Sequence, residues 1–254
     1  FKNTLRQQGI EVRFADPADP KNFEKLTDDK TRAYYGESCP NPYLRVFPIK
    51  EVADIGRPKG IPLIIDNTAS PVICKPLAHG AAIVMHSLTK YIGGHGTSIG
   101  GIVVDGGNFD WTKNRKRQPL LNEPDQSYGG AVWIDAVPKL TGANIPFVIR
   151  LRVVLLRDTG APLAPFNAWQ IIQGLETVGL RMKQHCSNAE KIVTFLETQK
   201  KVQNVIYPTN HQGEIKERAL KYMKGGYGSL VGMDVGTKEN GAKFIDNLKM
   251  LYHV

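Results

Sequence analysis

The sequence contains few cysteines. Cys39, Cys74 and Cys186 are odd in number and far apart, and no CxxC pair occurs. Neither a disulfide framework nor a zinc site is therefore expected, and reduced structural thiols are predicted. The 6 histidines show no HxxxH or HExxH spacing. The sequence thus predicts no metal-binding residues.

Long apolar runs are missing as well. No stretch approaches the roughly 18 consecutive apolar residues of a membrane span, and the first residues do not form a signal peptide. The 254 residues, 41% of them hydrophobic and 22% charged, suit one large or two modest globular domains. We expect a cytoplasmic protein without membrane contact. Because the chain starts at Phe1 and ends inside a helix-like segment, we expect an internal piece of a longer protein.

Positive charge is in excess, with a net charge of +9, and residues 113–117 form the short basic run KNRKR. Such a run attracts nucleic acid or phosphate. Without interleaved aromatic residues, however, a solvated loop is the favoured interpretation. A basic nucleic-acid-binding protein remains a competing hypothesis, and strongly salt-dependent association with DNA or RNA would mark it.

The first half of the chain has the rhythm of an α/β protein. Residues 62–67 and 82–86 are apolar runs of the kind found in a buried parallel sheet and predict strands, and residues 32–37 and 100–105 are further predicted strands. Residues 10–14 are a further strand candidate, and residues 50–56 predict a short helix.

The second half changes to helical spacing. Apolar residues three and four apart predict helices at 165–173 and 174–200, interrupted by Gly174 and Gly179. Short strands follow at 202–207 and 229–235, with a last helix at 244–254. We therefore predict a major domain, residues 1–174, and the start of a smaller α+β domain, residues 175–254.

One lysine stands in an unusual setting, within the stretch SLTKYIGGHG. Lys90 follows a buried strand, and glycines after it let the backbone approach a ligand. A lysine attacks carbonyl groups when desolvation or a neighbouring positive charge keeps its amine partly neutral, and we expect Lys90 to be so placed. Ser87 and Thr89 offer hydroxyl groups to a phosphate. Asp66 ends the preceding strand, and ligands gather at the carboxyl ends of such strands.

Together these side chains describe a site for pyridoxal phosphate. A carboxylate can hold a proton on the pyridine nitrogen, a lysine can form an imine with the aldehyde, and hydroxyls can bind the phosphate. Each part alone is a weak signal, since an Asp-Asn pair after a strand is more often a turn. The prediction depends on their combination.

Three motifs resemble the signature of the Cys/Met-metabolism pyridoxal phosphate enzymes of fold type I. They are ESCPNP at residues 37–42, DNT at 66–68 and HSLTKY at 86–91, and residues 165–168 and 174–182 also fit. The resemblance implies an aspartate aminotransferase-like α/β fold, with a mainly parallel sheet flanked by helices. Within the family, residues 93–105 and the segment 111–147 look like the O-acetylhomoserine sulfhydrylase branch.

The resemblance also implies roles for single residues. Lys90 would form the internal aldimine and, once released, carry protons. Asp66 would pair with the pyridinium nitrogen and keep the ring an electron sink. Ser87 and Thr89 would bind the phosphate.

Two residues of the first motif receive lesser roles. Asn41 would contact the ring oxygen of the cofactor or the substrate carboxylate. Glu37 would support the end of its strand, which is a structural role.

The implied reaction is γ-replacement, in which O-acetyl-L-homoserine loses acetate and takes up sulfide or a thiol to give homocysteine or methionine. The implied assembly is a homo-oligomer, a dimer or tetramer with shared active sites. A methionine or cystathionine γ-lyase or γ-synthase with the same cofactor is the alternative, and a relative that has lost catalysis is another.

The chain also departs from the family pattern. The rest of the phosphate cup normally precedes the residues present, and the arginine that binds the substrate carboxylate normally follows them. Ala69 replaces the aromatic residue that is common after Asp-Asn-Thr. We therefore expect the reacting lysine to be present here without a complete active site.

Overall fold

The computed structural model describes residues 1–251. Its main sheet contains β1 (Tyr34–Glu37), β2 (Leu63–Asp66), β3 (Ile83–Ser87) and β4 (Gly101–Asp105), in that spatial order. The first three strands are parallel, and β4 runs antiparallel to β3. The predicted mainly parallel sheet is therefore confirmed, with four of the predicted strands within two residues of their expected ends.

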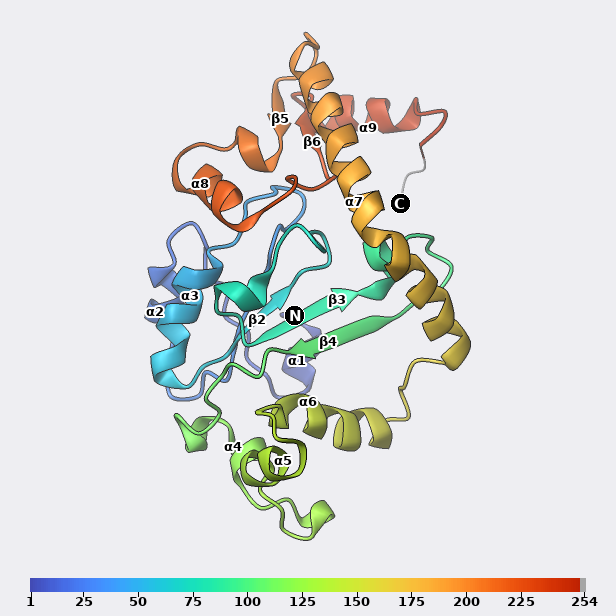
Figure 1. Ribbon diagram of the computed structural model, residues 1–254. Coiled ribbons are helices and arrows are strands. Elements are labelled where there is room, and N and C mark those ends of the chain that lie inside the picture. The colour runs from blue at the N-terminus through green and yellow to red at the C-terminus, as the bar shows by residue number, and fades with distance from the viewer. Residues whose placement is uncertain (252–254) are drawn as a thin grey trace.

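Helices cover both faces of this sheet (Figure 1). On one face, Leu63 and Ile65 pack with Val52 and Ala53 of α3 (Ile49–Gly56), in a core that also takes in Phe23 of α2 (Lys21–Lys25). The predicted helix at 50–56 is confirmed by α3. Alternation along each strand sends neighbouring side chains to the opposite face.

The opposite face has an aromatic core. There Ile83 packs with Phe109, Trp111 and Trp133. The segment that covers it comprises α4 (Pro119–Asn122), α5 (Trp133–Thr141) and α6 (Pro146–Arg150), which continues into a π-helical stretch at Leu151–Leu156. A short first helix, α1 (Thr4–Gln7), precedes all of these. The predicted flanking of the sheet by helices is thus confirmed.

The long helix α7 (Pro165–Glu197) has 33 residues and is continuous. The prediction of two helices broken at Gly174 is wrong. A Cβ atom built on Gly174 would lie only 2.1 Å from the carbonyl oxygen of Gly93, so this glycine permits close packing instead of ending the helix. In Figure 1, α7 runs from the small second sheet past the tip of β3.

The second sheet pairs β5 (Asn204–Ile206) with β6 (Gly232–Asp234) in antiparallel fashion. Both lie inside the predicted strands and are shorter than expected. The helices α8 (Gly213–Tyr222) and α9 (Lys238–Asp246) complete this part. The predicted domain boundary at residues 174 and 175 falls inside α7, whose first half packs on the turn Leu88–Ile92 after β3 and whose end packs on β5.

Two further predicted elements differ from the structure. Residues 10–14 form no strand, because no neighbouring strand offers them hydrogen bonds, and Phe14 is 68% exposed. The last helix begins earlier than expected, at Lys238, because the Thr237 hydroxyl accepts a hydrogen bond of 3.1 Å from the backbone N–H of Asn240. That helix ends at Asp246, and residues 252–254 of the predicted helix lie outside the described residues.

The three cysteines are unpaired and buried, as structural thiols would be. Burial raises the pKa of Cys74 to about 12, and burial together with the nearby Cys74 and Glu37 raises the pKa of Cys39 to about 12. These thiols are therefore protonated and unreactive near neutral pH. Across residues 1–251, no helix is both long and apolar enough to cross a membrane.

The basic run at 113–117 is partly structural. The Arg117 side chain is buried and donates hydrogen bonds to the carbonyl oxygens of Lys59 at 3.1 Å and Asp28 at 2.8 Å, and it also reaches Thr31. Its neighbours Arg115 and Lys116 are exposed, as expected for a solvated loop. Arg117 is therefore unavailable to bind a phosphate backbone.

Candidate active site

The predicted site residues meet at the carboxyl edge of the main sheet. Glu37 lies opposite Asp66 in the register of β1 and β2, and Asp66 lies opposite Met85 in the register of β2 and β3. Ser87 is two residues beyond Met85, so its side chain leaves β3 on the face that Asp66 occupies. Lys90 follows within one turn. The sheet thus brings Asp66, Ser87 and Lys90 to one edge.

The Asp66 carboxylate is held by two neighbours. Its Oδ1 atom accepts a hydrogen bond of 2.8 Å from the backbone N–H of Thr68, and the Tyr35 hydroxyl lies 3.4 Å from Oδ2 as a donor. Desolvation, together with the charges of Asp66 and Glu37, raises the pKa of Tyr35, so this phenol stays protonated and able to donate. One edge of the carboxylate is therefore fixed from within the chain.

Two further side chains respond to this carboxylate. Desolvation and the Asp66 charge both raise the pKa of Glu37. On β3, desolvation lowers the pKa of His86, although Asp66 pulls the other way. His86 is therefore a neutral imidazole near neutral pH. Its Nδ1 atom is buried and has no hydrogen-bond partner among residues 1–251.

Thr68 joins the ends of β2 and β3. Its hydroxyl oxygen accepts the backbone N–H of Ser87 at 2.7 Å, while its own N–H binds Asp66. Asp66 and Ser87 are therefore held at a fixed separation by one intervening residue. The sequence motif contained Thr68, but no role followed from it because this contact joins residues of different strands.

Lys90 lies in the π-helical turn Leu88–Ile92, where its own backbone departs from helical geometry with φ −88° and ψ −125°. The carbonyl of Lys90 accepts the N–H of Gly94 at 2.8 Å, and that of Leu88 accepts the N–H of Gly93 at 2.9 Å. Lys90 is exposed, so residues 1–251 do not desolvate its amine, and the part of the prediction that depends on desolvation is wrong. The turn projects beyond the sheet edge, which leaves the amine in contact with solvent.

The hydroxyl of Thr89 faces the start of β4. It accepts the N–H of Gly100 at 3.1 Å and lies 3.4 Å from the carbonyl oxygen of the same residue. The second contact is long for an O–H donor, so the proton of Thr89 remains available to an anion.

Asn41 occupies an exposed position on the loop after β1, next to the cis peptide bond Asn41-Pro42. No hydrogen bond within residues 1–251 links it to Asp66 or Lys90, so its role stays a prediction. Nor, in that same part of the chain, do three or more His, Cys, Asp or Glu side chains come together as a metal site would require.

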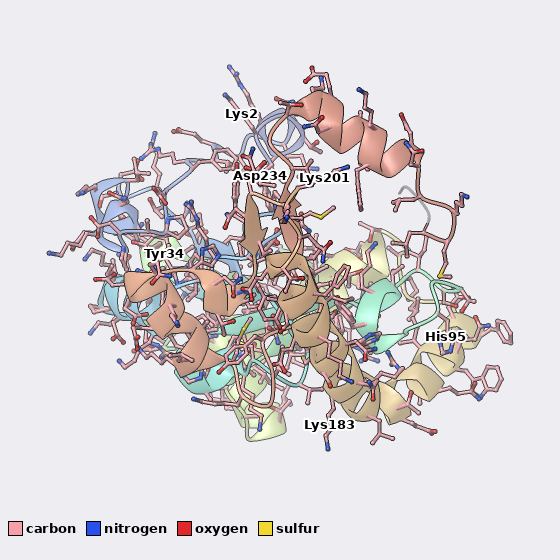
Figure 2. The ribbon with its side chains drawn as sticks, turned by 90° about the horizontal axis from the view of Figure 1, so that it is seen from above. Lys2, Tyr34, His95, Lys183, Lys201 and Asp234 are labelled. Atoms are coloured by element: carbon pink, nitrogen blue, oxygen red, sulfur yellow. The ribbon has the colours of Figure 1, made fainter. Side chains whose placement is uncertain are left out.

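Sequence reasoning gave no role to Arg181, which lies on α7. Its guanidinium donates hydrogen bonds to the carbonyl oxygens of Tyr91 at 2.6 Å and Ile92 at 3.1 Å, directly after Lys90. The loop that follows, marked by the exposed His95, lies beside the first half of α7 in Figure 2. The family resemblance of residues 174–182 includes Arg181 but did not indicate this contact, because 90 residues separate Arg181 from Tyr91.

Comparison with known proteins places this arrangement in a family. An O-acetyl-L-homoserine sulfhydrylase from Leptospira meyeri is 45% identical over 253 residues, which is 97% of this chain and 57% of that protein. A putative O-acetylhomoserine (thiol)-lyase from Campylobacter jejuni, whose crystal structure contains a lysine-linked pyridoxyl phosphate, is 34% identical with a TM-score of 0.89. That match covers 99% of this chain and 61% of the other.

A cystathionine γ-lyase from Lactobacillus plantarum is less similar, with 27% identity and a TM-score of 0.76 over 99% of this chain and 56% of its own. The chain therefore spans between half and two thirds of the length of these relatives. The sequence profile of the Cys/Met metabolism PLP-dependent enzymes matches residues 1–254. Both the matched length and the shared fold lead to one conclusion: the chain belongs to the Cys/Met metabolism PLP-dependent enzyme family.

Proposed function

We propose that this chain binds pyridoxal phosphate and serves γ-replacement on O-acetyl-L-homoserine, with sulfide or a thiol as the incoming group. The observation that carries the proposal is the meeting of Asp66, Ser87 and Lys90 at one sheet edge, linked through Thr68. The similarity to named sulfhydrylases supports the choice of reaction, since the cystathionine γ-lyase is the more distant structure.

The donor set fits this cofactor. Asp66 keeps Oδ2 weakly engaged, at 3.4 Å from Tyr35, so it can accept a proton-bearing ring nitrogen. Ser87 and Thr89 present hydroxyls two residues apart, as a phosphate requires, and Lys90 presents a primary amine one residue further on. When bound, the pyridine ring supplies an electron sink for charge that develops on the substrate carbon.

Each residue then has a defined task. Asp66 would hold the proton on the ring nitrogen. Ser87 and Thr89 hold the phosphate, with Thr89 positioned by its bond from Gly100. Lys90 would hold the cofactor through its aldehyde carbon, the aldehyde oxygen leaving as water, and the amine, once freed by the substrate, would hold and move the proton of the substrate α-carbon. Asn41 contacts the ring oxygen or the substrate carboxylate.

The structural division proposed for the chain follows from these tasks. Residues 1–174 carry every proposed cofactor contact, and residues 175–254 begin the smaller domain. We place the enzyme in the cytoplasm, as suits buried, unpaired cysteines. Fractionation of cells that express a tagged protein checks this location.

We further propose a homo-oligomer that uses the first half of α7. This half exposes large apolar side chains three residues apart, namely Phe166 at 64%, Trp169 at 52%, Ile172 at 56% and Leu175 at 51%. Contiguous exposed apolar surface marks an interface, and a second copy is the occupant that we propose. Light scattering on the protein and on Trp169→Glu tests it: the variant should lose subunits, and an unchanged mass with an unchanged fold contradicts the proposal.

The test of function uses the protein at its full natural length. We expect a visible absorbance band that borohydride abolishes by fixing the cofactor to Lys90, and no such band in Lys90→Ala. A protein that stays colourless with added pyridoxal phosphate contradicts the cofactor assignment. Sulfide incorporation measured against α-keto acid release, with several amino acids, separates the sulfhydrylase from a γ-lyase: the proposal requires incorporation to dominate.

A further inference from the structure

Arg181 contacts both the Lys90 turn and its own helix. Besides Tyr91 and Ile92, its guanidinium binds the carbonyl oxygen of Gly174 at 2.6 Å, and its Nε donates to the Thr177 hydroxyl at 3.1 Å. One side chain thus ties the turn that carries the lysine to two residues of its own helix.

The carbonyls that Arg181 binds lie at the end of a single turn. Terminal carbonyls of helical turns lack partners in the turn itself, so a donor from outside sets their direction. A guanidinium does so strongly, because its bonds are charge-assisted and its planar fork fixes their geometry. The two carbonyls belong to the first and second residues after Lys90, so fixing them fixes the backbone from which the reacting amine extends.

The helix α7 approaches the turn so closely that a side chain at either of two glycine positions would clash. A Cβ atom on Gly174 would lie 2.1 Å from the carbonyl oxygen of Gly93, and one on Gly94 would lie 2.6 Å from the Nη1 atom of Arg181. Gly94 also has φ +79°, which disfavours other residues. Glycines therefore occupy both sides of the contact, and Arg181 reaches the turn through the space that they leave.

We propose that Arg181 is a positioning residue, which holds the Lys90 turn in the conformation that aims the lysine amine at the cofactor aldehyde. The proposal rests on the proposed function for its consequence in catalysis, whereas the conformational effect stands without cofactor. Lys90 is exposed, so packing around its own side chain does not set its direction, and its backbone must.

The first measurement is hydrogen exchange in the cofactor-free protein at its full natural length. The amides of Gly93 and Gly94 bind carbonyls within the turn and report on its opening. In Arg181→Met they should exchange at least about tenfold faster, because several hydrogen bonds from a charged donor are lost. Arg181→Lys should fall between, since an ammonium replaces some of these bonds but not the fork.

Arg117→Met is the matched control. Arg117 also binds three backbone carbonyls, but none near Lys90. For each variant, the change in unfolding free energy is subtracted from the change in exchange free energy at the Gly93 and Gly94 amides. After this correction, Arg117→Met should match the wild type, whereas the Arg181 variants should not. Equal exchange in Arg181→Met and the wild type overturns the proposal, as does equal acceleration in both methionine variants. Should Arg181→Met not fold, Arg181→Lys decides by the same comparison.

The second measurement is kinetic. With cofactor bound, Arg181→Met should lower kcat about tenfold or more, with KM changed less than about threefold, because the amine is misdirected while the substrate contacts remain. An unchanged kcat overturns the proposal. If the wild-type protein shows no borohydride-sensitive visible band, the proposed function is refuted. The proposal for Arg181 is then decided by the hydrogen-exchange measurement alone.

Discussion

The hydroxyl oxygen of Thr68 accepts a hydrogen bond of 2.7 Å from the backbone N–H of Ser87. Thr68 also donates its own N–H to Asp66, so one residue connects the proposed partners of the two ends of the cofactor. The ring nitrogen and the phosphate of a bound cofactor are a fixed distance apart. A residue that sets the separation of Asp66 and Ser87 therefore sets how well the cofactor fits.

Replacing Thr68 by valine should weaken cofactor binding while the fold remains. Thr68→Val keeps the branched shape but leaves the Ser87 N–H without its acceptor. The affinity for pyridoxal phosphate should therefore fall about fivefold to tenfold. Absorbance titration with pyridoxal phosphate measures the change. Thr68→Ser keeps the hydroxyl and should bind nearly as the wild type does; equal affinity in Thr68→Val would show that this link is not used.

Two glycines of α7 should respond to alanine in opposite directions. Gly174→Ala pushes a methyl group against the backbone of Gly93 and should destabilise the protein by about 1–3 kcal/mol. Gly179 is exposed with nothing within 4 Å of an added Cβ, so Gly179→Ala should stabilise it by up to about 1 kcal/mol. Urea unfolding of both variants provides the comparison. A loss of stability in both would mean that α7 is not packed as described.

The contact between α8 and α3 should make stability depend on acid pH. Desolvation of Glu51 opposes its ionisation, but hydrogen bonds from Lys221 at 2.7 Å and Tyr222 at 2.5 Å favour the carboxylate more strongly. The pKa of Glu51 is therefore lowered below its ordinary 4.5. A lowered pKa in the folded state means stabilisation that is fully present above 4.5 and is lost as pH falls through the folded value.

Glu51→Gln should therefore have a flatter stability profile than the wild type on the acid side of pH 4.5. Urea midpoints measured across that range test this. Tyr222→Phe should lose about 1 kcal/mol at neutral pH, because its hydroxyl also accepts the N–H of Lys50 at 3.1 Å. Parallel profiles for Glu51→Gln and the wild type would exclude Glu51 as the source of the acid sensitivity.

Within the basic run, stability should depend on one arginine only. Arg117→Met leaves three carbonyls without their donor and should cost about 3 kcal/mol or more. Lys116→Met changes an exposed side chain and should lie within about 0.5 kcal/mol of the wild type. Urea unfolding measures both, and binding of the wild type to duplex DNA at low and moderate salt should show no steep salt dependence.

The sheet and the position of the lysine could be predicted because their signals are local. Apolar runs bounded by glycine and proline marked β2, β3 and β4, and the carboxyl-end rule for parallel strands placed Asp66, Ser87 and Lys90 together. Charge and hydroxyl types then suggested the cofactor. None of these steps needed a contact between distant parts of the chain.

The features that escaped prediction all depend on such contacts. Gly174 looks like a helix breaker until Gly93 lies against it, and residues 10–14 alternate like a strand but find no neighbour. Arg117 and Arg181 look like surface charges in the sequence. In the structure, their guanidinium groups donate hydrogen bonds to backbone carbonyls of residues far away in the sequence. The exposure of Lys90 also depends on how its turn projects from the sheet, and no local sequence pattern predicts that projection.

The continuity of α7 has a mechanical consequence. A helix of 33 residues is about 50 Å long, and its two ends lie on different sides of the glycine contact. Val193 near one end packs on Val205 of the small sheet, while Gly174, nearer the other end, touches the lysine turn. Because Arg181 of the same unbroken helix is hydrogen-bonded to Tyr91 and Ile92, a displacement of the small sheet would be transmitted through α7 to the turn that carries Lys90.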